Sequence, residues 1–412
     1  MKFLRTKFLP ILVGFIFVLF MTNDFGLVNI ERTAIIMAIG IDYEESAKEY
    51  EVTVQIAIPK PSTNAQGENN DSLISEKGKT IAAAIDKIGI TTGWYPMLSF
   101  CNLILVGDSL LKMNVMETLN YFIRTDKIQD SAHVATCDGK AKDILSATTP
   151  LDSISSFTIQ KILGKDIAKL DRIADTSLKT FTETYYSKSK SGFMPFVKKI
   201  EIDKSPDGSS SSSSSSGGAS GSGGSSGSSD KEGKKQYIFD ASSTAIFNEG
   251  YHVETLTPEE TLFFNIEHKN SLDTFLSLDE VEINGKKTAV MLGINEYSKK
   301  YKFKIEEDLP VYHVDLIFFC KFEDADVQAD VQNLNPTAKI PESVLTAAED
   351  KITKTLNSLF NKLISSKCDL FQVEDMLYRF HYSHYKSLSG TTLEKLKLKT
   401  SVDCQSEKST RL

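Results

Sequence analysis

The sequence predicts a multi-domain α+β protein with mixed or antiparallel sheets, helices packed on them, and one N-terminal membrane segment. Three observations support this prediction. Runs typical of strands, either alternating or continuously apolar, are interleaved with apolar residues at helical spacing. The length of 412 residues is more than one hydrophobic core usually holds. Finally, the uncharged run Phe8–Met21 stands directly behind three cations.

The run Phe8–Met21 (FLPILVGFIFVLFM) predicts export of the rest of the chain. As a helix it would measure about 21 Å, which is less than the roughly 30 Å of bilayer hydrocarbon. Lys2, Arg5 and Lys7 favour a cytoplasmic N-terminus, so the residues after Met21 should lie outside. Because no small-x-small pair follows the run, we favour a retained, tilted anchor, and a cleaved signal segment is the alternative.

Composition shifts predict four segments along the chain. These are a membrane anchor or signal segment over 1–23, an N-terminal α+β domain over 28–190, a middle domain over 191–285 with a disordered Ser/Gly loop over 205–235, and a C-terminal α+β domain over 286–404. The Ser/Gly tract cannot bury apolar surface. Because strand-like segments, Met194–Ile202 and Tyr237–Phe247, flank it, we interpret it as a hairpin loop rather than a linker. Lengthening a loop to this extent costs only about 1.8 kcal/mol.

The first region should have the element order β-β-α-β-α-β-α. Thr33–Asp42 is continuously apolar, as in a buried strand, and the alternating Tyr50–Pro59 should pair with it antiparallel. Pro61–Ser75 is expected to be a polar loop. The remaining elements expected here are a helix over Lys79–Gly89 with Gly89 as C-cap, a strand over Ser99–Val106, a helix over Met116–Ile128, a strand over Ala132–Cys137 and a helix over Ala141–Ala147.

The second half predicts further helices and a group of strands. Leu151–Tyr186 is helical, with a break near Gly164. At Thr257-Pro258-Glu259-Glu260 a capping box starts a helix that ends near His268. Strands are expected over Phe275–Lys287, Thr288–Glu296, Tyr301–Ile305 and Val311–Phe322, with a turn at Asn284-Gly285, followed by helices over Ser343–Ser366 and Leu370–Tyr382 and an edge strand over Leu393–Val402.

Charge and cysteine content limit the partners and the compartment chemistry. The net charge is −8 at pH 7, and the part after the N-terminal cations is still more acidic, which does not favour nucleic acid or anionic lipid headgroups as partners. The cysteines are Cys101, Cys137, Cys320, Cys368 and Cys404. Their odd number and long spacings argue against a disulfide scaffold and against a zinc site, so we expect buried small hydrophobes.

The titratable residues that could carry chemistry are dispersed. The six histidines are His133, His252, His268, His313, His381 and His384. His381 and His384 could share a helix face, but two ligands do not make a metal site, so we favour residues of an aromatic-rich helix. His133 and Cys137 would lie on one face of a strand, yet nothing nearby should lower the thiol pKa, and we interpret Cys137 as structural.

Other short patterns also favour structural roles. Gly164-Lys165 lacks the upstream glycine and the following Ser or Thr of a phosphate loop. Gly107-Asp108-Ser109 is typical of a strand-to-helix turn, and Arg124 with Asp126 could form a buried structural pair. No pair of carboxylates stands out for acid–base catalysis. The sequence therefore predicts no enzyme and no catalytic, cofactor-binding or metal-binding residues.

Several segments together resemble one known family. They are Ile30–Asp42 (IERTAIIMAIGID), Tyr50–Pro59, Lys79–Ile88, Cys101–Leu111, Leu119–Asp126 (LNYFIRTD), Ala135–Leu145, Ala241–Leu262 and Cys368–Tyr382. In this order the chain is similar to the Ger(x)C family, the C subunits of bacterial spore germinant receptors. Members usually carry a lipidated cysteine, which alignment on Gly40-Ile41-Asp42 would put near Asp24. The first cysteine here is Cys101, so lipidation is not predicted and Phe8–Met21 would be the anchor.

Two further departures concern the C-terminal signature and the Ser/Gly tract. Gln372 and Glu374 replace small residues or glycines of the family, which puts the turn geometry there in question. The Ser/Gly tract is an insertion that the family resemblance does not account for.

The resemblance implies a non-enzymatic, membrane-attached subunit made of three α+β domains. It would work beside an A-type subunit and a transporter-like B-type subunit in the spore inner membrane, with its C-terminal body on the extracytoplasmic face, and would contribute to nutrient-triggered germination. Asp24–Glu31 and Tyr378–Tyr385 are the segments expected to face partners, with a spacer and a core helix as the respective alternatives. The alternative function is an exported hydrolase or ligand-binding protein anchored at the membrane.

Overall fold

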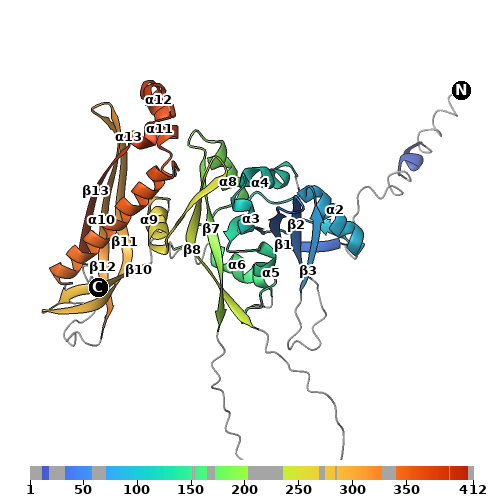
Figure 1. The fold of residues 1–412 in the computed structure, drawn as a ribbon, viewed down its shortest axis with the longest axis horizontal. Helices are drawn as coiled ribbons and strands as arrows, with labels where there is room; N and C mark the ends of the chain where they lie inside the picture. Colours follow the sequence, from blue (N-terminus) through green and yellow to red (C-terminus); the bar gives the residue numbers. More distant parts are fainter. Residues whose placement is uncertain are drawn as a thin grey trace, which may run out of the picture.

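The computed structural model is α+β, with two sheets and helices packed on them, as the sequence predicts (Figure 1). It describes residues 12–17, 33–57, 71–125, 127–150, 152, 154–164, 172–202, 235–268, 274–283, 285–326, 340–388 and 390–406. The C-terminal sheet and its long helix lie at one end of the molecule, and α2 lies at the other (Figure 1).

The larger sheet has nine strands in the order β3-β2-β1-β5-β6-β7-β8-β9, with β4 paired to β1. The strands are β1 Thr33–Glu44, β2 Glu49–Ala57, β3 Asp71–Gly78, β4 Tyr95–Met97, β5 Leu103–Val106, β6 His133–Cys137, β7 Ser191–Ile202, β8 Gln236–Asn248 and β9 Tyr251–Leu256. The central pairs β1–β5, β5–β6 and β6–β7 are parallel, and the outer pairs are antiparallel. The sheet is therefore mixed.

Helices cover both faces of this sheet. They are α2 Ile81–Thr92, α3 Asp108–Leu111, α4 Val115–Arg124 and α8 Leu178–Tyr186 on one face, and α5 Ala141–Leu145 and α6 Ser155–Leu163 on the other. Strand β5 shows why two cores form. Ile104 and Val106 belong to the first core, whereas Leu103 and Leu105 belong to the second, because successive side chains of a strand point to opposite faces.

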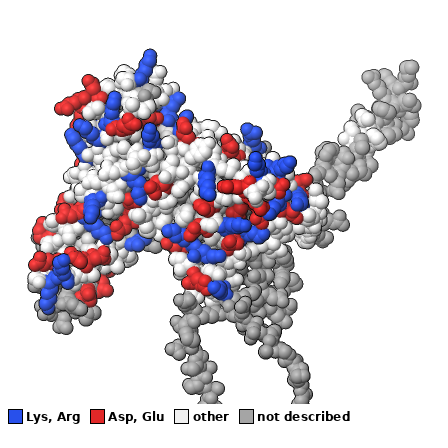
Figure 2. Space-filling model, in the orientation of Figure 1, with Lys and Arg blue, Asp and Glu red and all other residues white. Residues whose placement is uncertain are grey.

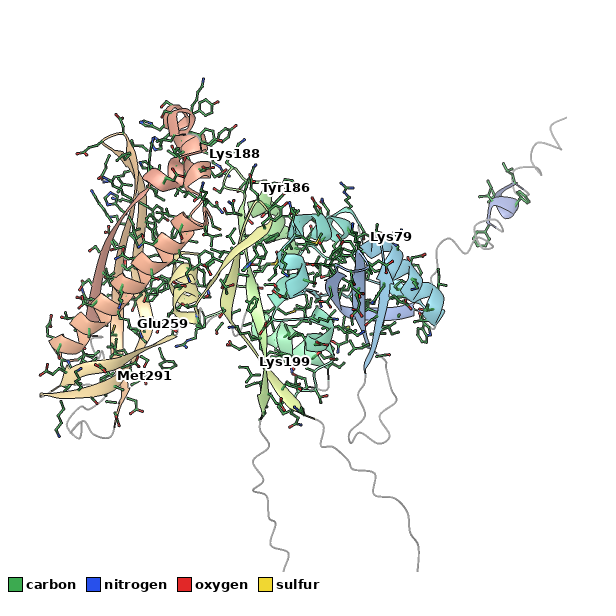
Figure 3. All side chains as sticks on the ribbon, viewed as in Figure 1. Lys79, Tyr186, Lys188, Lys199, Glu259 and Met291 are labelled. Atoms are coloured by element: carbon green, nitrogen blue, oxygen red, sulfur yellow. The ribbon has the colours of Figure 1, made fainter. Side chains whose placement is uncertain are left out.

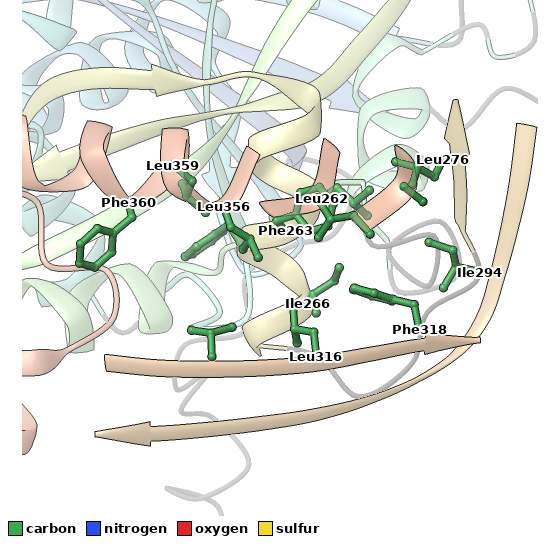
Figure 4. Close-up of a cluster of buried hydrophobic side chains, with 14 of the residues drawn as sticks. Leu262, Phe263, Ile266, Leu276, Ile294, Leu316, Phe318, Leu356, Leu359 and Phe360 are labelled. Atoms are coloured by element: carbon green, nitrogen blue, oxygen red, sulfur yellow. The ribbon is translucent and has the colours of Figure 1, made fainter. Parts of the chain in front are cut away.

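The smaller sheet has the order β10-β11-β12-β13. Its strands are β10 Thr274–Ile283, β11 Lys286–Glu306, β12 Leu309–Ala325 and β13 Lys397–Ser406; the helices of this part are α9 Pro258–His268, α10 Glu342–Ser365, α11 Val373–Phe380, α12 Tyr382–Leu388 and α13 Thr392–Lys395. Helix α10 lies along the sheet, and its Leu356 and Leu359 share a buried core with Leu316 and Phe318 of β12 (Figure 4). Removing these side chains from water stabilises the part as a unit.

Several local predictions are confirmed. Strands β1 and β2 pair antiparallel, with Ile41 opposite Val52. Strands β7 and β8 form the two arms of an antiparallel hairpin up to Ile202 opposite Gln236, while the Ser/Gly tract itself lies outside the described residues. The capping box is present, because the Thr257 N–H donates to Glu260 Oε2 at 2.9 Å and the Glu260 N–H to Thr257 Oγ1 at 3.2 Å. Strand β13 is an edge strand, as expected.

Other predictions about single elements are wrong. The end of the expected polar loop is strand β3, which pairs with β2 from Asp71 onward. Helix α2 runs past Gly89 and ends at Gly93, whose φ of +71° supplies the left-handed cap. Strand β11 is one strand of 21 residues rather than two, because both of its neighbours hold it and register shifts absorb the irregularity. The last predicted helix, Leu370–Tyr382, is shorter than expected, since α11 runs from Val373 to Phe380 and a separate helix, α12, begins at Tyr382.

The predicted membrane run is described only over residues 12–17, which are helical, and its remaining residues lie outside the described part. Among the helices that the structure describes, none has both the length and the apolar character needed to cross a bilayer.

The larger sheet continues through the predicted domain boundary at 190/191, since it includes β7, β8 and β9. The division into domains remains a prediction.

Candidate partner-binding surface

A groove of about 540 Å³ lies where the end of α8 and the start of β7 meet the C-terminal helices. Figure 3 shows Tyr186 and Lys188 at this junction. Residues that line the groove include Tyr186, Lys188 and Lys190 from the first part and Glu374, Tyr385 and Glu394 from the second. The groove thus combines side chains that the sequence separates by about half of its length.

Beneath the groove, the buried carboxylate of Asp369 connects its two sides. Asp369 Oδ2 accepts hydrogen bonds from the Ser189 hydroxyl at 2.7 Å and from the Glu374 N–H at 2.8 Å, and Oδ1 accepts one from the Val373 N–H at 2.9 Å. The Asp369 N–H in turn donates to Ser191 Oγ at 2.8 Å. Burial raises the pKa of Asp369, although these donors act in the opposite direction.

The turn that starts α11 depends on an unusual backbone conformation. Gln372 has φ +54°, in the left-handed region where glycine is favoured, and its own side chain makes no capping hydrogen bond. Asp369 supplies the cap instead, through the N–H groups of Val373 and Glu374. Glycine adopts such a positive φ without steric cost. The backbone at this position is left-handed although the residue is Gln372.

An exposed aromatic cluster projects from α11 and α12 beside the groove. We call it the tyrosine cluster and define it as Tyr378, Tyr382 and Tyr385, whose ring centroids lie 5.3 to 6.1 Å apart. Lys188 Nζ lies 4.6 Å from the centre of the Tyr378 ring, within cation–π distance. Tyr382 is 60% exposed and the neighbouring Phe380 is 76% exposed. Aromatic side chains that are partly exposed to solvent in this way are enriched at protein interfaces.

The exposure of these rings bears on the core helix that the sequence left as an alternative for Tyr378–Tyr385. Tyr385 is partly buried against the C-terminal core, whereas Tyr378, Phe380 and Tyr382 are exposed. The helix ends at Phe380, and Tyr382, the first residue of α12, is exposed. The other segment expected to face partners, Asp24–Glu31, lies outside the described residues.

His381 and His384, the two histidines considered as metal ligands, lie beside each other with ring centroids 6.3 Å apart, and each also has another neighbour. His381 packs its ring 5.9 Å from that of Phe303, and His384 Nε2 lies 3.8 Å from Asp308 Oδ1. His133 Nδ1 is 2.7 Å from Asp175 Oδ1. Over the described ranges, no group of three or more His, Cys, Asp or Glu side chains is arranged to hold a metal ion.

The thiols lie in the cores. All five cysteines are free and buried. Burial raises the pKa of Cys137 well above its ordinary value, and it raises the pKa of Cys101 and Cys368 to about 12. A thiol of this kind stays protonated near neutral pH and is a poor nucleophile.

The remaining short patterns have structural surroundings where the structure describes them. Gly107 begins α3, and a Cβ there would meet Asp42 Oδ1 at 1.9 Å, so the strand-to-helix turn requires glycine. Gly164 ends α6, and Lys165 lies outside the described residues. The prediction of a buried pair is wrong for Arg124, which is exposed, while its expected partner Asp126 lies outside the described residues.

Sequence reasoning missed the two buried aspartates that position these elements. Asp42 accepts hydrogen bonds from the N–H groups of Ala141 at 2.9 Å and Lys142 at 3.2 Å, which caps α5. Asp369 does the same for α11 and also reaches Ser189. Only the position of Asp42 at the end of an apolar run hinted at such a role. The partners of Asp42 and the Ser189 partner of Asp369 are remote in the chain, and only Val373 and Glu374 are close to their acceptor.

Two family models match the chain. One is described as the spore germination protein N-terminal domain and matches residues 27–199, and the other, described as spore germination B3/GerAC like, C-terminal, matches residues 242–407.

Curated relatives and a solved structure are similar to the chain. Spore germination protein KC of Bacillus subtilis (strain 168) is 23% identical over 377 residues, which cover 87% of this chain and 84% of that protein. Spore germination protein B3 of the same organism is 28% identical over 141 residues, 34% of this chain, and the match spans only 37% of that protein's length. The crystal structure of the GerBC protein aligns with a TM-score of 0.49 and 16% identity, covering 89% of this chain and 96% of that chain.

Proposed function

Because the chain belongs to the Ger(x)C family of spore germination proteins, we propose that it is a non-enzymatic, membrane-attached subunit of a germinant receptor. The observation that carries the proposal is the pair of family models, which follow one another along the chain from residue 27 to residue 407. The subunit would contribute to nutrient-triggered germination by contacts with other proteins rather than by chemistry of its own.

Attachment to the membrane is proposed to use Phe8–Met21 as a retained anchor. The support is in the sequence, because cations precede an uncharged run and the first cysteine, Cys101, is too far along the chain to serve as a lipid-modified residue near the N-terminus. The body after the anchor would then lie on the extracytoplasmic face of the spore inner membrane or cell membrane.

The contacts are proposed to involve A-type and B-type receptor subunits through the tyrosine cluster and the groove beside it. Supporting this, Tyr382 and Phe380 expose large apolar areas next to a hollow lined by both parts of the protein. Positive and negative side chains are mixed over the face shown in Figure 2. The surface is therefore suited to protein contacts that combine aromatic and polar groups.

The buried groups that could perform chemistry support a non-enzymatic role. Asp369, the most buried acid beside the groove, already accepts three hydrogen bonds from within the protein. The alternative, an anchored hydrolase or ligand-binding protein, would need a pair of available carboxylates in that groove. Glu374, whose pKa burial raises, is half-buried there, but the oxygens of Asp369 face protein donors. The other carboxylates of the groove, Glu249 and Glu394, lie beside Lys190 and Lys367.

Two measurements test the proposal. In intact protoplasts, a tag placed after Leu412 should be removed by added protease, and a protected tag would contradict export of the body. In spores of the host, deletion of the gene should abolish germination with at least one nutrient, and the full chain should restore it. Normal germination of the deletion strain with every nutrient that triggers the parent would contradict the receptor role.

A further inference from the structure

A second exposed apolar surface lies far from the tyrosine cluster, at the end of α2. We call it the Trp94 patch and define it as Ile90, Trp94 and Tyr95, which are 73%, 48% and 45% exposed. All three line a hollow of about 590 Å³, together with Tyr121 and Lys127. Singly exposed apolar residues are common, whereas a group that includes Trp, Tyr and Ile around one hollow points to a binding surface.

Packing within the protein does not explain these side chains. Helix α2 buries the face that carries Ile81, Ala84, Ile85 and Ile88, and Ile90 lies about 200° further round the helix than Ile88. The left-handed Gly93 then turns the chain toward β4, and Trp94 in this turn and Tyr95 at the start of β4 line the same hollow as Ile90. The fold therefore holds an apolar surface in water that its own core does not use.

The patch lies beside the point where the chain enters the folded body. Strand β4 runs parallel to the start of β1, with Tyr95 opposite Thr33, the first described residue of that strand. Eleven residues, 22–32, separate Thr33 from the end of the predicted membrane run at Met21. Even fully extended, eleven residues span at most about 40 Å. The Trp94 patch is thus close enough along the chain to the predicted membrane run to reach the bilayer surface.

We propose that the Trp94 patch rests in the lipid–water interface of the membrane that holds the N-terminal segment. Trp and Tyr are enriched at this depth because their rings combine an apolar body with a polar group, and Ile90 would enter the acyl region. This inference depends on the proposed membrane attachment. The second contact would fix the orientation of the body relative to the membrane, which a single point of attachment does not do.

Apolar burial rather than charge attraction should drive this contact. The hollow contains one acid, Asp86, and one cation, Lys127, whose Nζ donates to the Tyr95 hydroxyl at 3.2 Å and lies 5.6 Å from the ring centre. The chain as a whole is acidic, with a net charge of −8. Binding should therefore persist when anionic lipid is replaced by zwitterionic lipid.

The experiment uses Trp94 itself, which is the only tryptophan of the chain. The full chain is reconstituted into vesicles of phosphatidylethanolamine and phosphatidylglycerol, with or without lipids brominated near the headgroup. We expect the Trp94 emission to shift to shorter wavelength and to be quenched by the brominated lipids. The matched control is the double variant Trp94→Phe, Ile238→Trp, which moves the reporter to an exposed site on β8 and should show neither effect.

A second variant and a flotation assay separate the possible outcomes. Ile90→Asp should float with the vesicles as the parent does and should lose most of the lipid quenching. If the parent chain floats but Trp94 is quenched no more than the reporter at position 238, the patch does not reach the membrane and this inference is overturned. If the chain does not float, the proposed anchor fails, and the inference fails with it. Shielding of Trp94 only when another protein or a second copy is added also overturns it.

Discussion

The hydroxyl of Ser189 donates a 2.7 Å hydrogen bond to the carboxylate of Asp369, a residue 180 positions later in the chain. Both groups are buried, and the same carboxylate caps α11. Together with the hydrogen bond from the Asp369 N–H to Ser191 Oγ, this contact sets the start of β7 against the helix that carries Tyr378. The position of the tyrosine cluster beside Lys188 therefore depends on a polar pair in the interior of the protein.

Replacement of Asp369 by alanine should destabilise the protein strongly. The substitution leaves the Ser189 hydroxyl and the N–H groups of Val373 and Glu374 without their buried acceptor. We expect the free energy of unfolding to fall by about 3 kcal/mol, measured by urea denaturation. The control is Asp130→Ala, whose side chain is exposed, whose backbone is not left-handed, and whose loss should change stability by less than about 0.5 kcal/mol. Equal effects of the two substitutions would contradict the role assigned to Asp369.

The stability that Glu260 supplies should depend on pH. Burial alone would raise its pKa, but Lys362 Nζ at 2.7 Å, with the Thr257 N–H and the Ser358 hydroxyl, lowers the pKa below the ordinary value of 4.5. Because unfolding then takes up a proton in acid, this stabilisation is complete above about pH 4.5 and is lost as the pH falls through the lower folded-state pKa.

Glu260→Gln should accordingly be less stable than the parent at pH 7, and the difference should shrink as the pH falls below about 4.5. Circular dichroism during denaturation at several pH values measures it. The matched control is Glu280→Gln, which breaks an exposed ion pair with Lys287 and should change stability little at pH 7. A difference for Glu260→Gln that is constant from neutral to acid pH would show that its charge is not the cause.

Gln372→Gly should stabilise the protein. At φ +54° the glutamine pays the steric cost of the left-handed conformation, which glycine avoids, although glycine loses more chain entropy on folding. We expect a net gain of up to about 1 kcal/mol in the free energy of unfolding. The same exchange at Gln405, in edge strand β13, should destabilise instead, since its backbone is extended. Destabilisation at both positions would mean that the side-chain contacts of Gln372 stabilise the protein by more than its left-handed backbone destabilises it.

The five thiols should be unreactive in the native protein. Burial raises the pKa of Cys101 and Cys368 to about 12, so that these two hold hardly any thiolate at pH 8. A hydrogen bond with Cys404 lowers the pKa of Cys320, but this thiol, like the others, is buried away from a reagent. An aromatic disulfide reagent should detect no thiol without denaturant and five in denaturant. A thiol that reacts within seconds in the native chain would indicate a core more open than described.

Tyr382→Asp should weaken the proposed partner contact without affecting folding. The ring is 60% exposed, so the free energy of unfolding should change by less than about 0.5 kcal/mol. The recovery of other receptor subunits with the tagged chain from solubilised membranes should fall several-fold. Phe275→Asp serves as the control, because that side chain is 44% exposed on β10 and does not line the groove. Unchanged recovery with Tyr382→Asp would remove the tyrosine cluster from the interface.

Local patterns predicted most of the helices and strands, because each depends on residues close together in the chain. Helix α9 follows from the box of Thr257 and Glu260, and β1 from a continuous apolar run. The hairpin of β7 and β8 could be inferred across the Ser/Gly tract, since both arms carry strand patterns. The family, too, was recognisable from ordered segments of the sequence.

The tertiary structure alone decided what each element packs against. The polar sequence of β3 becomes a strand because β2 offers a free edge for its hydrogen bonds, and β11 stays continuous because neighbours on both sides hold it. Likewise, the exposure of Tyr382 and the burial of Asp369 follow from partners far along the chain. Periodicity reports which face of a segment is apolar, whereas the partner of a polar or aromatic side chain is set by which distant segment folding brings beside it.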